Sequence, residues 1–344
     1  MYRFGVLIIL LMIILSPCAY SRTITDMAGR KVDIPDRIEK AIGLSPPATY
    51  LIYAIDPALL AGLNLPLWEH EKIYTADRLK KLPVVGGMVG EGRNLNVEVL
   101  LGIKPDIVIL WQLNRDDINA INKKYEQILK PLGIPIVYVR INSISDYPAA
   151  FRFVGDVLGR KERAAALERY AVGAMRKVSR SLSGLPPGKR VSVYYAEGLD
   201  GLSTEGEESL HTRLIPLSGG RNVCRMKETS LMGLEKISME QLLMYDPDAI
   251  LVMEKPCYER VMKDARWKHL RAVRGKRVYL IPNAPFNWFD RPPSYMQFLG
   301  IQWLAGLLHP GLYQVDMVRE TKTFYRLFLG RDLTDREARQ VLQQ

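Results

Sequence analysis

Side chains suited to metal or nucleophilic chemistry are scarce in this sequence. Its 344 residues include three cysteines and four histidines, and the histidines form no His-x-His or His-Glu-x-x-His pattern. Gly-rich phosphate-binding loops and the Gly-x-Ser-x-Gly segment of hydrolases are missing as well. We therefore expect no metal site, no cofactor and no enzymatic activity.

Charge of one sign is not concentrated anywhere in the chain. The formal net charge is +11, but the 48 lysines and arginines are scattered among 37 acidic residues, without a block of five or six like charges. This pattern excludes a basic tail and disfavours nucleic acid as a partner. It is compatible with an anionic small ligand.

Long apolar runs are limited to the N-terminus. Residues 6–15 form an unbroken apolar stretch after Arg3, and small residues follow in a small-x-small arrangement. The stretch is too short to be a comfortable transmembrane span. It predicts a secretory signal peptide over 1–21 and export of the mature chain to an extracytoplasmic compartment.

The cysteines leave two questions open. Residues 15–18 resemble a lipoprotein cleavage box, so Cys18 is a candidate for lipid anchoring, although Pro17 departs from that pattern. Without Cys18, only Cys224 and Cys257 remain in an oxidising compartment. They form either a disulfide or two buried free thiols. Neither has the Cys-x-x-Cys partner or nearby histidine of a zinc site.

An internal repeat is the most informative feature of the sequence. Residues 96–109 contain Glu, a Leu pair, Pro-Asp and a β-branched run, and the same order returns in residues 238–251 at a constant offset of 142. Leucine pairs pack a helix, proline ends it, and a β-branched run is typical of a buried parallel strand. The repeat therefore predicts two similar lobes.

Further strands support two α/β lobes. Each half opens with a strand, at 40–44 and 190–195, and has another at 134–139 and 276–281. Strands that alternate with helices indicate parallel sheets. We expect an α/β fold with two similar Rossmann-like lobes and a ligand cleft between them.

A long helix is predicted between the lobes. Residues 161–182 carry apolar side chains at helical spacing and end in a Pro/Gly-rich stop. Such a helix is a stiff connection that restricts hinge motion. Near the C-terminus, two helices and a capping box at 334–337 are expected. The expected organisation is a signal peptide over 1–21, an N-terminal lobe over 22–158, a connecting helix over 159–184 and a C-terminal lobe over 185–344.

These patterns together resemble a known family. A secreted chain with a Glu-x-Leu-Leu-x-x-x-Pro-Asp-strand unit in each half is similar to the extracytoplasmic binding proteins of ABC importers. The long middle helix narrows the resemblance to the subfamily that delivers iron–siderophore complexes, haem and vitamin B12. Residues 24–30 and 218–223 also match recurring family segments. The resemblance implies a monomeric binding protein that works with a permease dimer and separate ATPase subunits.

Glu98 and Glu240 occupy the same position in the two repeats. In the first turn of a helix, each carboxylate is stabilised by about 0.3–1 kcal/mol through the helix dipole. This structural effect explains their position without any binding function. The resemblance implies more, because one exposed glutamate per lobe docks onto permease arginines in this family. We therefore expect Glu98 and Glu240 to be permease-docking residues.

Ligand-binding candidates follow the strands. Ligands of open α/β sheets bind beyond the carboxyl ends of the strands, and three of the five tryptophans fall in the loops expected there. The loop 287–294 presents two aromatics, an acid and an arginine between prolines, and is similar to the corresponding loop of vitamin B12-binding proteins. Arg291 in this loop could bind a carboxylate or oxyanion of the ligand, or form an ion pair with its neighbour Asp290 instead. The expected ligand-binding residues are Trp68, Arg93, Trp111, Tyr195, Trp288, Phe289 and Arg291.

Two ligand classes stay open at this point. The main expectation is an iron or other metal chelate, such as a siderophore complex, haem or a corrinoid. The alternative within the same family is a small metal oxyanion such as molybdate or tungstate, or a simple metal complex. A two-lobed metal-cluster enzyme is disfavoured, because a cluster needs several thiolates and the mature chain offers two.

Overall fold

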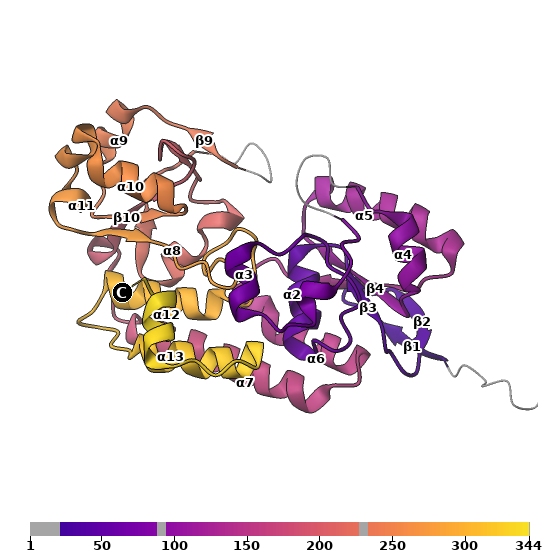
Figure 1. Ribbon diagram of the computed structural model, residues 1–344. Coiled ribbons are helices and arrows are strands. Elements are labelled where there is room, and N and C mark those ends of the chain that lie inside the picture. The colour runs from indigo at the N-terminus through magenta and orange to yellow at the C-terminus, as the bar shows by residue number, and fades with distance from the viewer. Residues whose placement is uncertain (1–20, 88–93, 227–232, 344) are drawn as a thin grey trace, which may run out of the picture.

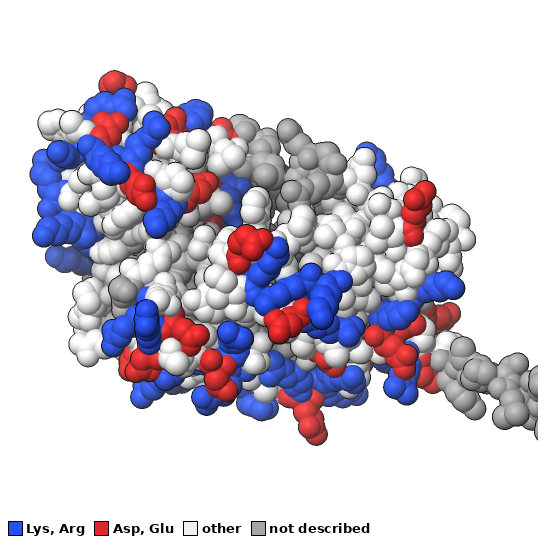
Figure 2. Space-filling view, in the orientation of Figure 1, with Lys and Arg blue, Asp and Glu red and all other residues white. Residues whose placement is uncertain are grey.

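The computed structural model describes residues 21–87, 94–226 and 233–343. Residues 1–20 of the predicted signal peptide, including Cys18, and the candidate Arg93 lie outside the described residues, whereas Ser21 begins strand β1. Within them, no helix is long and apolar enough to cross a bilayer. On the face shown in Figure 2, basic and acidic side chains are interspersed, in line with the scattered charges of the sequence.

The N-terminal lobe is built on a parallel three-stranded sheet in the order β3-β4-β5. Its strands are β3 (Ala41–Gly43), β4 (Ile107–Gln112) and β5 (Ile136–Arg140), and they are almost wholly buried. An antiparallel hairpin of β1 (Ser21–Thr25) and β2 (Lys31–Pro35) precedes them. The helices of this part are α2 (Pro46–Ile55), α3 (Glu69–Tyr74), α4 (Val97–Ile103), α5 (Asp116–Leu129) and α6 (Tyr147–Val157).

The C-terminal lobe repeats this plan with one more strand. Its parallel sheet has the order β11-β10-β6-β8, formed by β6 (Val191–Ala196), β8 (Gly220–Asn222), β10 (Ala249–Val252) and β11 (Val278–Leu280). β7 (Ser203–Thr204) and β9 (Glu235–Lys236) form a small antiparallel pair. The helices are α8 (Leu214–Leu217), α9 (Met239–Tyr245), α10 (Lys255–Lys263) and α11 (Arg271–Arg274). The predicted fold of two similar α/β lobes is confirmed.

The two repeat units match in detail. Helices α4 and α9 each have seven residues, and a side chain at the N-cap accepts a backbone hydrogen bond in both. Both end on a left-handed residue directly before the proline, Lys104 with φ 53° and Asp246 with φ 35°. The aspartate after each proline then holds the start of the first strand of its lobe. Asp106 accepts the N–H of Lys40 at 2.8 Å, and Asp248 accepts the N–H of Ser192 at 3.0 Å.

Long helices connect the lobes along one side of the molecule (Figure 1). The predicted middle helix is α7 (Lys161–Ser181), and α12 (Gln297–Leu308) packs against it. The C-terminal residues form α13 (Met317–Phe324), a π-helical turn (Tyr325–Leu329) and α14 (Asp335–Val341), and the expected capping box at Thr334 is present. The lobe boundaries at 158 and 185 stay a prediction.

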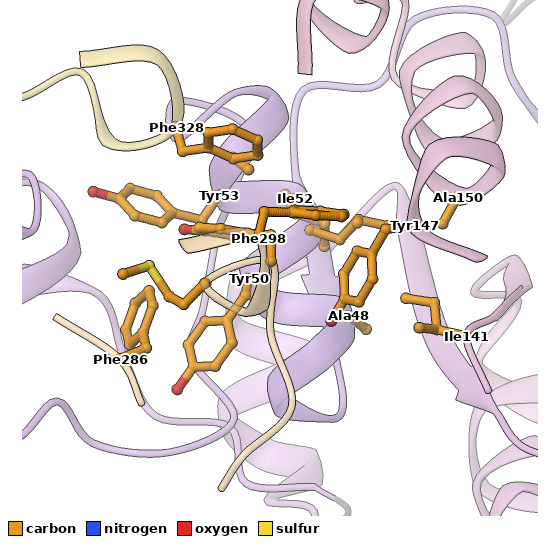
Figure 3. Close-up of a cluster of buried hydrophobic side chains, with 14 of the residues drawn as sticks. Ala48, Tyr50, Ile52, Tyr53, Ile141, Tyr147, Ala150, Phe286, Phe298 and Phe328 are labelled. Atoms are coloured by element: carbon orange, nitrogen blue, oxygen red, sulfur yellow. The ribbon is translucent and has the colours of Figure 1, made fainter. Parts of the chain in front are cut away.

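An aromatic cluster joins these helices to the N-terminal lobe. The ring centroid of Phe298 in α12 lies 5.8 Å from that of Tyr147 and 6.5 Å from that of Phe151, both in α6 (Figure 3). Phe328 of the π-helical turn lies 5.9 Å from Phe151. Burying each such ring stabilises the fold by roughly 1.5–3 kcal/mol. One continuous core therefore includes residues of both sheets, and it restricts movement between the lobes.

Candidate ligand cleft between the lobes

A cavity of about 30 Å³ lies where the two lobes meet. On the N-terminal side its walls come from the first turn of α2, the ends of β4 and β5 and the start of α6. On the other side they come from the segment before and in α8 and from the start of α12. The N-terminal wall includes Pro47, Trp111, Leu113, Asn142, Ser143 and Tyr147, and the other wall includes Leu210, Arg213, Leu214, Pro293 and Gln297. The volume is about that of one water, so the walls nearly touch.

The position agrees with the rule for parallel sheets. β4 ends at Gln112 and β5 at Arg140, and the residues that follow these strands line the cavity. Ligands of such sheets bind at the carboxyl ends of the strands. The segments after β4 and β5 therefore line this cavity, and their role in ligand binding stays a prediction.

Tyr147 contributes an unpaired polar atom to this wall. Its hydroxyl is buried and has no hydrogen-bond partner among the described residues. Burial raises the pKa of Tyr147 well above its ordinary value. The hydroxyl end points toward the first turn of α2, where Ala48 lies beside Pro47 (Figure 3). A buried hydroxyl without a partner carries a free-energy cost, which a bound polar ligand removes.

Arg213 is the charged residue of the cavity wall. It follows the 3-10 turn η5 (Leu210–Thr212) and its side chain is exposed. Within the described part of the chain, no acidic side chain lines the cavity, and Arg213 makes no ion pair. A guanidinium without a counter-charge in a narrow cleft attracts an anion.

The start of α2 offers few backbone donors to a ligand. Pro46 and Pro47 occupy the first two helical positions and have no N–H group. The side chain of Ser45 accepts from the next N–H, that of Ala48, at 3.5 Å. The first turn of α2 is therefore a poor source of backbone donors for an anion in this cavity.

Two of the three candidate tryptophans are buried inside the lobes. Trp111 is buried, and its Nε1 donates to the carbonyl of Ile141 at 2.9 Å. Trp288 has 0% of its surface exposed, and its Nε1 donates to the carbonyl of Ala284 at 3.2 Å. Burial of these large rings stabilises the lobes. Trp111 still lines the cavity.

Trp68 differs from the other two tryptophans. It precedes α3, has 65% of its surface exposed and does not line the cavity. Its backbone N–H donates to Glu71 at 2.6 Å, which fixes the start of the helix. A ligand contact by Trp68 stays a prediction.

The aromatic residues Tyr195 and Phe289 are also buried. Their ring centroids lie 5.0 Å apart, and the Tyr195 hydroxyl donates to Asp290 at 2.7 Å. The loop 287–294 is therefore anchored to strand β6 from inside the lobe. A direct ligand contact by either ring stays a prediction.

The guanidinium group of Arg291 is paired with acidic side chains of the C-terminal lobe. Its guanidinium forms ion pairs with Glu197 and Glu205, and Asp290 lies 3.6 Å away. Burial alone would lower the pKa of Arg291, but Asp290 and Glu197 raise it above the ordinary value. In this conformation the guanidinium of Arg291 already binds carboxylates, in line with the pairing alternative, and a ligand contact by Arg291 stays a prediction.

The acidic partners of Arg291 belong to a larger buried network. Glu197, Glu205 and Asp290 are almost fully buried, and Asp290 also contacts the His211 ring nitrogen Nδ1 at 2.6 Å. Burial, followed by the charge of Asp290, raises the pKa of Glu197 to about 9. We call Glu197, Glu205, His211, Asp290 and Arg291 the C-lobe charge network.

Sequence reasoning missed Tyr147 and Arg213. Tyr147 begins the helix after β5, so the strand-end rule extended by a few residues would have found it. Arg213 follows no strand of the sheet, and nothing in its local sequence distinguishes it from the other arginines.

Glu98 and Glu240 are exposed near the starts of α4 and α9, as predicted. Hydrogen bonds from its own backbone N–H and from Ser238 lower the pKa of Glu240. The structure records Cys224 and Cys257 as free, buried thiols, so of the two alternatives it contains the unpaired one.

Comparison with known proteins adds a family match and three similar proteins. The family described as periplasmic binding protein matches residues 70–285. An ABC transporter solute binding protein from Sulfurospirillum deleyianum is 34% identical in sequence, with a TM-score of 0.87 over 94% of this chain and 99% of that one. The molybdate-binding protein MolA of Haemophilus influenzae is 24% identical over 89% of this chain and 90% of its own length. A vitamin B12-binding protein of Pectobacterium carotovorum is 26% identical over 63% of this chain and 72% of its own.

Proposed function

Because the chain belongs to the periplasmic binding protein family and is an ABC transporter solute-binding protein, we propose that it captures a metal-containing solute between its lobes. The observation that carries the proposal is the cavity lined from both lobes at the carboxyl ends of the N-terminal strands. A solute there bridges the lobes and stabilises a closed form. The permease then distinguishes the loaded form from the empty one.

A metal chelate is the first candidate for this solute. The cavity wall is largely apolar, with Trp111, Leu113 and Leu214 among its side chains, and ligand pockets for organic molecules have such walls. The match to a vitamin B12-binding protein supports this class. A siderophore complex, haem or a corrinoid is far larger than the present cavity, so the lobes must separate to admit it.

A small metal oxyanion is the second candidate. The similarity to a molybdate-binding protein extends over 89% of the chain. The cavity volume of about 30 Å³ also suits a small solute better than a large one. In this case Arg213 and the polar side chains of the cleft carry recognition.

The transport partner is an ABC permease dimer with separate ATPase subunits. The support is the equivalent placement of Glu98 and Glu240, exposed at the second position of two helices that match in length and caps. Paired sites on two lobes can meet paired sites on two permease subunits. We assign the docking contact to these two carboxylates.

Export from the cytoplasm completes the proposal. The N-terminal sequence has the charged, apolar and small-residue regions of a signal peptide over 1–21, with lipid anchoring at Cys18 as the variant. For a small solute the closure is small, because α7 is continuous between the lobes and a shared core crosses them. A metal chelate requires a wider separation of the lobes. The chain itself performs no catalytic step.

Native mass spectrometry of the protein purified from its own host, with metal analysis of the same sample, tests the proposal. A bound mass of several hundred daltons or more with iron or cobalt supports the chelate class. Molybdenum or tungsten without organic mass supports the oxyanion class. A metal-free bound solute, such as a sugar or an amino acid, would contradict both.

A further inference from the structure

We propose that Arg213 and Tyr147 recognise an anionic oxygen of the solute, so that the cation of this cleft is Arg213 and not Arg291. The inference rests on the proposed function and names the residues that determine which solutes bind. The shared chemistry is a negatively charged oxygen, either on an oxyanion or on a carboxylate of a metal chelate.

The first argument is the contrast between the two arginines. Arg291 is flanked by three buried carboxylates, and its guanidinium is committed to Glu197 and Glu205. Arg213 has no carboxylate near it in either of the two cavities that it lines. An incoming anion competes with two ion pairs at Arg291 and with water alone at Arg213.

The second argument concerns an uncharged hydrogen-bond donor, the hydroxyl of Tyr147. Tyr147 lines the opposite wall of the same cavity, and its hydroxyl is buried and unpartnered among the described residues. A hydroxyl donates one hydrogen bond, and an anionic oxygen is its strongest acceptor. An oxygen held between Arg213 and Tyr147 would be bound by one residue from each lobe, which links recognition to closure.

The third argument concerns the remaining donors. The first turn of α2 lacks two N–H groups because of Pro46 and Pro47. The Gln297 amide donates to the carbonyl of Phe289 at 2.6 Å, and the Trp111 indole donates to that of Ile141. These two donors already have acceptors, whereas the Tyr147 hydroxyl has none among the described residues and Arg213 makes no ion pair there.

Isothermal titration calorimetry of the purified protein tests the assignment. Sodium molybdate serves as the oxyanion probe and ferric citrate as the carboxylate chelate, and the probe that binds identifies the source of the oxygen. For that probe, Arg213→Gln is expected to weaken binding about 10- to 100-fold, and Arg213→Lys less. The control Arg221→Gln, at an exposed arginine on β8 of the same lobe, leaves affinity unchanged.

Tyr147→Phe separates recognition from folding. Removing an unpaired buried hydroxyl leaves the free energy of unfolding equal or higher, whereas binding of the probe weakens several-fold. The assignment is overturned if Arg213→Gln binds within twofold of wild type, or if wild type binds neither probe. In the latter case a metal-bearing solute found by native mass spectrometry would leave the proposed function standing.

Discussion

The hydroxyl of Tyr195 donates a 2.7 Å hydrogen bond to Asp290, a residue 95 positions later in the chain. This contact ties the loop 287–294 to strand β6 inside the C-terminal lobe. It also completes the surroundings of Arg291, whose charge is balanced by carboxylates of the C-lobe charge network. The loop 287–294, which the sequence indicated as a ligand-binding loop, is therefore anchored by contacts inside the C-terminal lobe.

Replacing Arg291 is expected to affect folding first. Arg291→Met leaves the buried carboxyl groups of Glu205 and Asp290 without their cation, which costs about 3–5 kcal/mol of the free energy of unfolding. Urea denaturation followed by circular dichroism measures the loss. Arg221→Met, at an exposed position, is the matched control and stays within about 0.5 kcal/mol of wild type. A stable Arg291→Met protein would show that the network does not depend on this guanidinium.

Glu197 should make stability depend on pH. Its pKa is raised to about 9 in the folded protein from an ordinary value of 4.5, mainly by burial. A carboxyl with a higher pKa in the folded state favours folding fully below the unfolded value, and this contribution is lost as the pH rises through the folded one. Relative to Glu197→Gln, wild type therefore loses free energy of unfolding between about pH 5 and about pH 9.

Urea titrations of both proteins at several pH values measure that difference. Glu207→Gln, at an exposed glutamate nearby in the sequence, is the control and should follow wild type at every pH. Parallel curves for wild type and Glu197→Gln would contradict the prediction.

If Glu98 and Glu240 dock onto the permease, replacing them should impair solute uptake without changing solute affinity. Glu98→Ala or Glu240→Ala should lower solute uptake by on the order of tenfold, the effect of losing about 1.4 kcal/mol at an interface. Solute affinity should not change, because both residues are exposed on helices away from the cavity. Glu162→Ala, in the first turn of α7, is the control for removing an exposed helix carboxylate. Equal losses of uptake and affinity would argue against docking.

The free thiols predict slow chemical modification. Cys224 and Cys257 are buried, and burial raises the pKa of Cys257 to about 12, so little thiolate exists at neutral pH. Iodoacetamide should label both residues only after unfolding, with peptide mass spectrometry to locate the label. Recovery of a peptide with Cys224 linked to Cys257 would show the disulfide instead.

The repeat in the sequence predicted much of the fold because it is built from local signals. Pro105 and Pro247 end their helices through the residues before them, and the leucine pairs and β-branched runs mark the packed faces. The long helix over 161–181 was equally readable, since its apolar spacing continues to a Pro/Gly stop. Each of these features depends on neighbours in the chain.

The cleft was less predictable because its chemistry depends on contacts across the fold. Arg291 and Trp288 have the residue types of a binding loop, but Glu197 and Glu205, about 90 positions earlier, occupy the arginine. Arg213 gains its proposed role from lining the same cavity as Tyr147 of the other lobe. Neither relationship has a sequence spacing that could have revealed it.

The most direct test of solute capture between the lobes is hydrogen–deuterium exchange of the empty and loaded protein, using the solute released from the purified protein. The account predicts slower exchange on loading both at 141–147 and at 210–217, which face each other across the cavity. Exchange should not change in α4 and α9, where the docking glutamates lie. Protection confined to one lobe, or absent from both segments, would contradict the account.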